Sequence, residues 1–99
     1  MPSRPRLDRL VWDDWNRDHL AKHAVLPEEA EEMVAGDPVV RQTSKDRLQF
    51  IGPTLTGRIL SVVAGRVPNE LGAYYVFSAR PASRKERDMY RKLKGDSTP

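Results

Sequence analysis

The 99-residue chain contains no cysteine. Disulfide bonds, thiolate metal sites and cysteine nucleophiles are therefore excluded. The chain also lacks an apolar run near the ~20 residues that a membrane span requires. The basic start, residues 1–6, is not followed by the apolar stretch of a signal peptide. We therefore expect a cytoplasmic protein without a membrane partner.

Apolar residues are also few, at 38% against 31% charged residues, which is typical of a soluble protein with a thin core. A chain of this length is too short for two independent cores. We expect one domain over residues 1–99, with flexible tails at residues 1–6 and 95–99.

The net charge of +3 conceals an uneven distribution along the chain. Residues 13–37 hold two basic and eight acidic side chains, a net charge of −6, whereas residues 38–99 hold twelve basic and five acidic ones, a net charge of +7. A basic half of a small domain favours a polyanionic or acidic partner. The alternative is a solvated surface on which the charges happen to segregate.

Hydrophobic periodicity and turn residues predict an α+β fold with a small antiparallel sheet and helices packed on it. In chain order we expect a strand over 7–12, a helix from Asp13 or Asp14 to 22 or 23, a helix from Pro27 to Gly36, strands from Val39, over 47–52, over 58–67 and over 72–80, and a last helix after Ser83. The stretch 58–67 is the most apolar and should be a central strand. The expected core comprises Trp12, Leu20, Met33, Phe50, Leu60, Val62, Val76 and Tyr90.

The last helix has a clear start, because Ser83 and Glu86 have the spacing of a capping box. This gives Glu86 a structural role that outweighs a catalytic one. Met89, Tyr90 and Leu93 should pack inward, and one face should carry the basic residues Arg84, Arg87, Arg91 and Lys94.

The two histidines, His19 and His23, stand four apart on a predicted helix, a spacing that can bind a metal. No third ligand is evident, so we expect no metal and no cofactor. A stacking, capping or phosphate-contacting role fits His23 better, and His19 should lie at the surface.

Arginine is the stronger candidate for function, because a guanidinium is always charged and binds phosphate bidentately. Arg58 begins one strand and Arg80 ends its expected antiparallel neighbour, so both should lie at the same edge of the sheet. We expect Arg58, Arg80 and Arg87 to converge on one anion site. The alternative is that Arg58 and Arg80 pair with acidic groups of the two helices that precede the strand at Val39.

Several short motifs, taken in order, resemble the BrnT toxin family over roughly residues 10–93. They are Trp12-Asp13, Lys22-His23, Pro27-Glu28-Glu29-Ala30, Asp46-Arg47, Ile51-Gly52 with Thr54, Gly57-Arg58 leading into Leu60 and Val62-Val63, Ser78-Ala79-Arg80, and Glu86-Arg87 followed by Tyr90. Ala24 departs from the pattern, since the family often has glycine after its Lys-His pair.

The resemblance implies a fold similar to the RelE and ParE toxins, ribonuclease activity that arrests translation, and a ribbon-helix-helix antitoxin as partner, with assembly into a dimer or a hetero-oligomer with the antitoxin. It implies that the catalytic positions are Lys22, His23, Arg58, Arg80, Arg87 and Tyr90. The basic residues expected to contact RNA are Arg47, Arg84, Arg91 and Lys94.

The chemistry needs no metal, because RNA carries its own nucleophile, the 2′-hydroxyl. Arg58, Arg80 and Arg87 would stabilise the phosphorane, and His23, Lys22 or Tyr90 would move protons. Imidazole is the side chain that ordinarily titrates near neutrality, but the sequence does not assign acid and base. The alternative function is a toxin-like module that binds an antitoxin or nucleic acid without catalysis. A ParE-like gyrase poison is a more remote third.

Overall fold

The computed structural model describes residues 6–44 and 46–95 of the chain. The expected tails lie outside the described residues except for Arg6 and Gly95. Lys45, between the strands expected from Val39 and over 47–52, also lies outside them. In chain order the elements are β1 (Arg9–Val11), α1 (Asp14–Ala21), α2 (Pro27–Ala35), β2 (Val39–Ser44), β3 (Arg47–Pro53), β4 (Ile59–Arg66), β5 (Ala73–Pro81), α3 (Arg84–Tyr90) and a π-helical turn, η1 (Arg91–Gly95). The predicted α+β order is confirmed.

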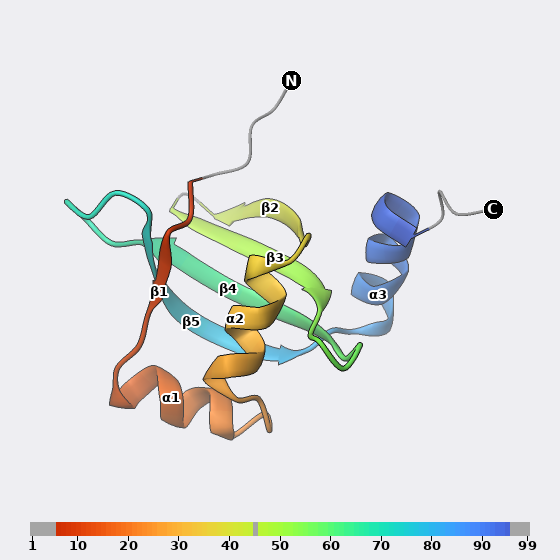
Figure 1. Cartoon of the computed structure of the whole chain (residues 1–99), viewed down its shortest axis with the longest axis horizontal. Coiled ribbons are helices and arrows are strands. Elements are labelled where there is room, and N and C mark those ends of the chain that lie inside the picture. The colour runs from red at the N-terminus through yellow and green to blue at the C-terminus, as the bar shows by residue number, and fades with distance from the viewer. Residues whose placement is uncertain (1–5, 45, 96–99) are drawn as a thin grey trace.

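The five strands form one sheet in the order β1-β5-β4-β3-β2 (Figure 1). Strands β2 to β5 are an antiparallel meander, as predicted, and β4 is central. The sheet is nevertheless mixed, because the short edge strand β1 pairs in parallel with β5. The two helices that follow β1 return the chain to the opposite edge of the sheet, where the meander begins.

Local sequence explains where the first two helices begin. The side chain of Asp13 accepts from the backbone N–H of Asn16 at 3.0 Å, and the Asn16 side chain accepts from the N–H of Asp13 at 2.8 Å. This is a capping box that satisfies two N–H groups at the start of α1. Helix α2 begins with Pro27, whose missing N–H costs nothing at that position.

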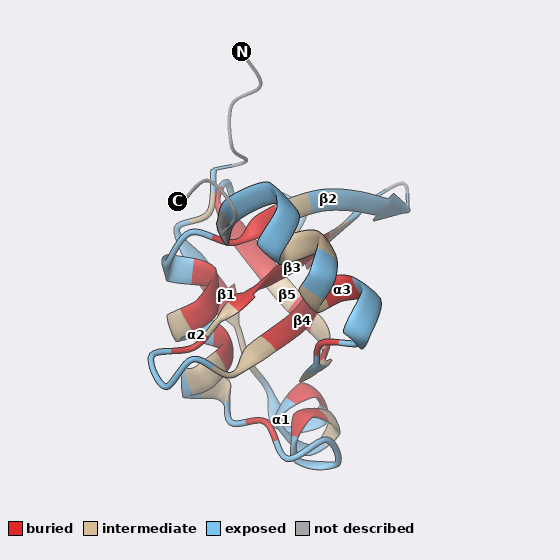
Figure 2. Cartoon of the chain, turned by 90° about the vertical axis from the view of Figure 1, so that its right-hand side faces the viewer, coloured by how far each residue is buried: buried red, intermediate tan, exposed pale blue. Residues whose placement is uncertain are grey.

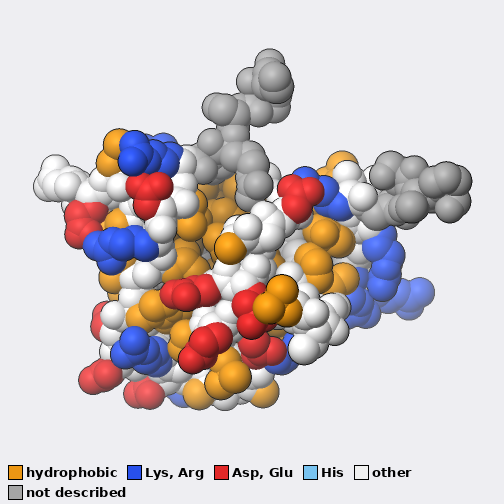
Figure 3. All heavy atoms as spheres, in the orientation of Figure 1, with side chains coloured by type: hydrophobic (Ala, Val, Ile, Leu, Met, Phe, Trp, Pro, Cys, Tyr) orange, Lys and Arg blue, Asp and Glu red, His pale blue; other side chains and the backbone are white. Residues whose placement is uncertain are grey.

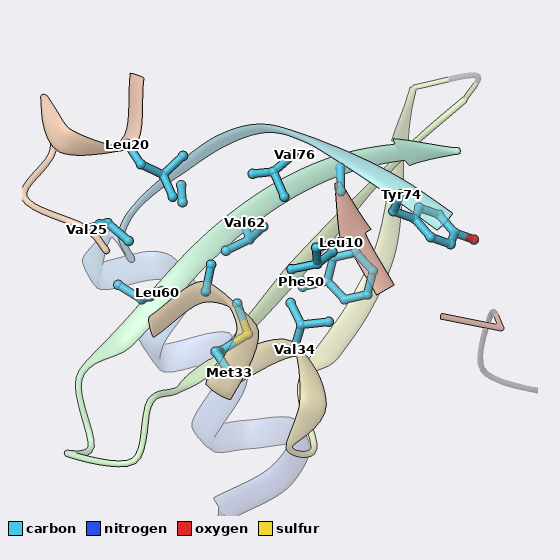
Figure 4. Close-up of a cluster of buried hydrophobic side chains, with 13 residues drawn as sticks. Leu10, Leu20, Val25, Met33, Val34, Phe50, Leu60, Val62, Tyr74 and Val76 are labelled. Atoms are coloured by element: carbon cyan, nitrogen blue, oxygen red, sulfur yellow. The ribbon is translucent and has the colours of Figure 1, made fainter. Parts of the chain in front are cut away.

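The core lies between the sheet and the pair α1 and α2 (Figure 4). Of the predicted core residues, Leu20, Met33, Phe50, Leu60, Val62 and Val76 are buried in it. Trp12 packs against its margin, and Tyr90 is half-buried outside it. The expectation for Leu93 was wrong, since this side chain is 63% exposed.

The opposite face of the sheet, here called the α3 face, carries Gln49, Ser61 and Arg80. The pairs Ile51–Ser61 and Ser61–Arg80 place side chains of three strands on this face. Helix α3 packs on β3 from this side, at the end of the sheet where β5 finishes (Figures 1 and 2). It covers only part of the α3 face, since Val63, Phe77 and Ser78 remain partly exposed.

Candidate functional site

A buried carboxylate holds the arginine at the end of β5. Arg80 Nη1 and Nη2 donate to Glu86 Oε1 and Oε2 at 2.8 and 2.9 Å, a bidentate pair. Glu86 Oε1 also accepts from the backbone N–H of Ser83 at 2.8 Å, which completes the predicted capping box. The Glu86 side chain is only 10% exposed, whereas that of Arg80 is 44% exposed. The pair therefore presents its cation to solvent and keeps its anion inside.

Charge and hydrogen bonding fix the ionisation of this pair. The hydrogen bonds from Arg80, with those from Ser83 and Gln49, lower the pKa of Glu86 to about 2, although burial opposes the change. The bonds to Glu86 in turn raise the pKa of Arg80 above its ordinary value. At neutral pH Glu86 is thus a permanent anion and too weak a base to accept a substrate proton.

Arg80 keeps hydrogen-bonding capacity beyond this pair. A guanidinium has five N–H donors. Nη1 also donates to the carbonyl of Pro81 at 3.3 Å, so Nη1 uses both of its hydrogens and Nη2 one. The remaining N–H of Nη2 and the Nε–H have no partner among the described residues. These two donors are available to an anion.

The pair is part of a polar network that crosses the sheet. Gln49 Nε2 donates to Glu86 Oε2 at 2.9 Å and to Ser61 Oγ at 2.8 Å. Arg41 Nε donates to Gln49 Oε1 at 2.7 Å, and Arg41 Nη1 lies 3.7 Å from Met89 Sδ of α3. A second exposed arginine therefore lies on the same face. Sequence reasoning missed Arg41 and Gln49, although a glutamine alternating with apolar residues was the available signal.

Arg58 and Arg80 lie at the same end of the adjacent strands β4 and β5, as predicted, but their guanidiniums point to opposite faces of the sheet. The N–H of Ala82, two residues after Arg80, donates to the carbonyl of Ile59 at 2.9 Å, so the strand ends are adjacent. Arg58 Nη1, however, donates to the carbonyl of Ala24 at 2.9 Å and pairs with Glu29 of α2 at 3.2 Å. The prediction that Arg58 and Arg80 converge was wrong. The alternative is confirmed for Arg58, which pairs with α2, whereas Arg80 pairs with Glu86 of α3 and with neither of the first two helices.

A β-bulge explains this outcome. Val63 pairs with Ser78 and Ala64 pairs with Val76, which leaves Phe77 without a partner on β4. The extra residue breaks the alternation of side chains along β5. Val76 therefore points into the core, whereas Ser78 and Arg80 point to the α3 face. Strict alternation would have placed Val76 and Arg80 on one face.

Lys22 and His23 are exposed in the turn between α1 and α2, at the same end of the sheet. Ala24, which stands where the family often has glycine, has a φ of 57° in the left-handed region that favours glycine. His23 meets the ring of His19 edge-on at 5.8 Å, and His19 stacks on the exposed Trp15 at 5.0 Å. The ring contact of His23 is thus edge-on rather than stacked, and its expected role stays a prediction. His19 is half-buried at the surface.

The basic residues of α3 and η1 have different surroundings. Arg87 Nη1 donates to the carbonyl of Ala82 at 2.9 Å, Arg84 is exposed, and Arg91 pairs with Asp88 at 3.3 Å. Lys94 lies in the π-helical turn and pairs with Asp37 at 2.8 Å, so α-helical spacing does not place it with the others. Figure 3 shows acidic side chains gathered over α2 and basic ones over α3.

Within residues 6–44 and 46–95, no group of three or more histidine, cysteine, aspartate or glutamate side chains is placed to hold a metal ion. No helix of the described chain is long and apolar enough to cross a membrane.

Comparison with known proteins gives a similar solved structure. The chain is similar to the crystal structure of the Brucella abortus ribonuclease toxin BrnT, with 31% sequence identity and a TM-score of 0.60. The match covers 76% of this chain and 96% of that one. No family model and no curated protein matches the chain.

Proposed function

The chain belongs to the BrnT toxin family, and from this premise we propose that it is a toxin that cleaves RNA without a metal. The observation that carries the proposal is its likeness, along nearly the whole of that chain, to a protein described as a ribonuclease toxin. The arginine site on the α3 face supports it, since a guanidinium with free N–H donors beside an open surface suits a phosphate.

Cleavage by the 2′-hydroxyl places extra negative charge on the phosphorus oxygens in the transition state. Arg80 is proposed to donate its two free N–H groups to these oxygens, and Glu86 holds it in place. Arg87 and Tyr90, on the helix packed against this face, complete the catalytic set on that side, with Arg47, Arg84, Arg91 and Lys94 contacting the rest of the RNA. Tyr90 would act as proton donor to the leaving oxygen or as a hydrogen-bonding group.

Lys22, His23 and Arg58 have a second role in the proposal. Arg58 anchors the α1–α2 turn through the carbonyl of Ala24. This contact holds the turn, and with it Lys22 and His23, near the end of the sheet at which β5 finishes with Arg80. We assign proton transfer to Lys22 or His23 and positioning to Arg58.

The proposed regulator is an antitoxin of the ribbon-helix-helix class, which would bind the toxin in the cytoplasm and form a hetero-oligomer. If a short reading frame for a ribbon-helix-helix protein lies beside this gene, its co-expression should restore growth and yield a co-purifying complex. Absence of both effects would contradict the proposed partner and leave the cleavage proposal to its own test.

We expect purified protein to cleave single-stranded RNA equally well with and without EDTA, and induced expression to arrest growth. Replacing the ribose at the cleaved position with deoxyribose should stop cleavage, because the nucleophile is then missing. A denaturing gel of end-labelled RNA measures both effects, with the Arg80→Ala protein as the control for contaminating nucleases. Harmless expression together with intact RNA would favour the non-catalytic binding module, and loss of cleavage in EDTA alone would contradict metal independence.

Binding should depend steeply on salt, because phosphates are neutralised by arginines. For about four phosphate contacts on a single strand, the slope of log affinity against log salt is about −3, so affinity falls about 50-fold between ~50 and ~200 mM salt. Fluorescence anisotropy with a 2′-O-methyl RNA, which cannot be cleaved, measures the slope. A flat response would count against phosphate recognition.

A further inference from the structure

A third arginine on the α3 face, Arg47, is held by an aromatic ring. The guanidinium carbon of Arg47 lies 3.9 Å from the centroid of the Phe77 ring, well within the range of a cation–π contact. The Arg47 side chain is exposed, and its N–H groups have no hydrogen-bond partner among residues 6–44 and 46–95. One side of the guanidinium is covered by the ring, while its edges and its other side remain free.

The backbone is shaped to hold this ring. Phe77 is the unpaired residue of the bulge in β5, and its ring reaches over Gly65 of β4. A Cβ at position 65 would lie 2.9 Å from Phe77 Cε2 and 3.0 Å from the carbonyl oxygen of Asp46. Only glycine therefore leaves room for the ring, and Gly65 is also the residue that pairs with Arg47.

Tyr75 supports the ring from the side. Its ring meets that of Phe77 at 5.2 Å, and its hydroxyl donates to the Asp13 carboxylate, with both oxygens at 2.9 Å. The position of Arg47 is thus determined by β3, β4, β5 and the start of α1 together.

The site is separate from Arg80. Arg47 is level with Gly65 and Arg80 with Ser61, four residues apart on β4, or about 13 Å at the rise of a strand. The two guanidiniums are also held by different partners, Arg80 by Glu86 and Arg47 by the Phe77 ring, so we assign them to different phosphates. A strand lying along the α3 face would place different nucleotides at the two positions.

We propose that Arg47 and Phe77 form a nucleotide subsite for single-stranded RNA, away from the cleaved bond. The free side of the guanidinium stacks on one base, and its N–H edge donates to a neighbouring phosphate, since RNA bases stack on guanidinium planes as they do on aromatic rings. The inference rests on the proposed function, because it takes RNA as the ligand.

The test is an abasic scan of a 2′-O-methyl RNA of about ten nucleotides, measured by fluorescence anisotropy. With wild-type protein, removing one particular base should weaken binding about tenfold, near the lower end of what base stacking contributes. Arg47→Lys keeps the charge but loses the planar group, so it should weaken binding of intact RNA about tenfold. For the Arg47→Lys protein, removing the base at that same position should cause no further loss of affinity.

Phe77→Leu and Gly65→Ala should reproduce this loss, because each displaces the support of Arg47. Arg9→Lys is the matched control, since Arg9 is an exposed arginine paired with Glu70 at the far edge of the sheet, and it should bind as wild type. Circular dichroism shows whether Gly65→Ala folds; if it does not, Arg47→Lys and Phe77→Leu decide.

Two outcomes separate this inference from the proposed function. If wild-type protein binds or cleaves RNA and the Arg47→Lys scan equals the wild-type scan, the subsite is overturned and the proposed function stands. If wild-type protein neither binds nor cleaves RNA at low salt, the proposed function is overturned and the subsite with it.

Discussion

Arg80→Ala should lower the rate of RNA cleavage about 10²- to 10³-fold, the usual effect of removing one donor to a developing oxyanion. It should also abolish growth arrest on induced expression. Arg80→Lys keeps the charge but not the paired N–H groups, and we expect it to retain only a small part of the activity. Single-turnover cleavage of end-labelled RNA measures the rate directly.

In Arg80→Ala, loss of folding must be separated from loss of catalysis. Removing the Arg80 side chain leaves the Glu86 carboxylate buried without its partner. The double variant Arg80→Ala/Glu86→Gln removes that charge, and it should regain stability without regaining cleavage. Arg58→Ala is the comparison on the opposite face of the sheet, and it should cost tenfold or less. Equal losses in Arg58→Ala and Arg80→Ala would contradict the different roles assigned to them.

Glu86→Gln should destabilise the protein by about 3 kcal/mol at pH 7. The carboxyl group has a pKa of about 2 in the folded protein and about 4.5 as a free group, and each unit of this difference corresponds to about 1.4 kcal/mol. Because the pKa is lowered on folding, the stabilisation is complete above about pH 4.5 and is lost as the pH falls towards 2.

Urea unfolding of wild type and Glu86→Gln across this pH range measures the effect. The difference in free energy of unfolding should be largest at neutral pH and should shrink steadily below pH 4.5. Glu70→Gln, which alters an exposed pair with Arg9, is the matched control and should change stability by less than ~1 kcal/mol. A Glu86→Gln difference that does not vary with pH would contradict the ion pair as its source.

The parts of the fold set by local chemistry were predictable. Asp13 and Ser83 cap helices because their side chains accept from N–H groups three residues on. Pro27 and the turn residues of the meander likewise act within a few positions of the chain. Side chains alternate between the two faces along the regular strands β3 and β4. This alternation predicts that Leu60 and Val62 are buried together.

What could not be predicted depends on contacts between distant segments. The bulge at Phe77 has no glycine or other local sequence signature. Its position in β5 depends on the Phe77 ring, which packs on Gly65 of the neighbouring strand β4. A single extra residue moved Arg80 to the face opposite Arg58. The parallel pairing of β1 with β5 depends on how two helices return the chain, which no stretch of sequence near β1 specifies.

RNA is expected to bind on the α3 face, with phosphates at Arg80 and Arg47. The most direct measurement is a titration of ¹⁵N-labelled protein with 2′-O-methyl RNA, followed through the arginine Nε–H signals in NMR spectra. The signals of Arg80 and Arg47 should shift in proportion to RNA bound, while that of Arg58, which faces α2, should remain in place. A shifted Arg58 signal with unmoved Arg80 and Arg47 signals would contradict the account.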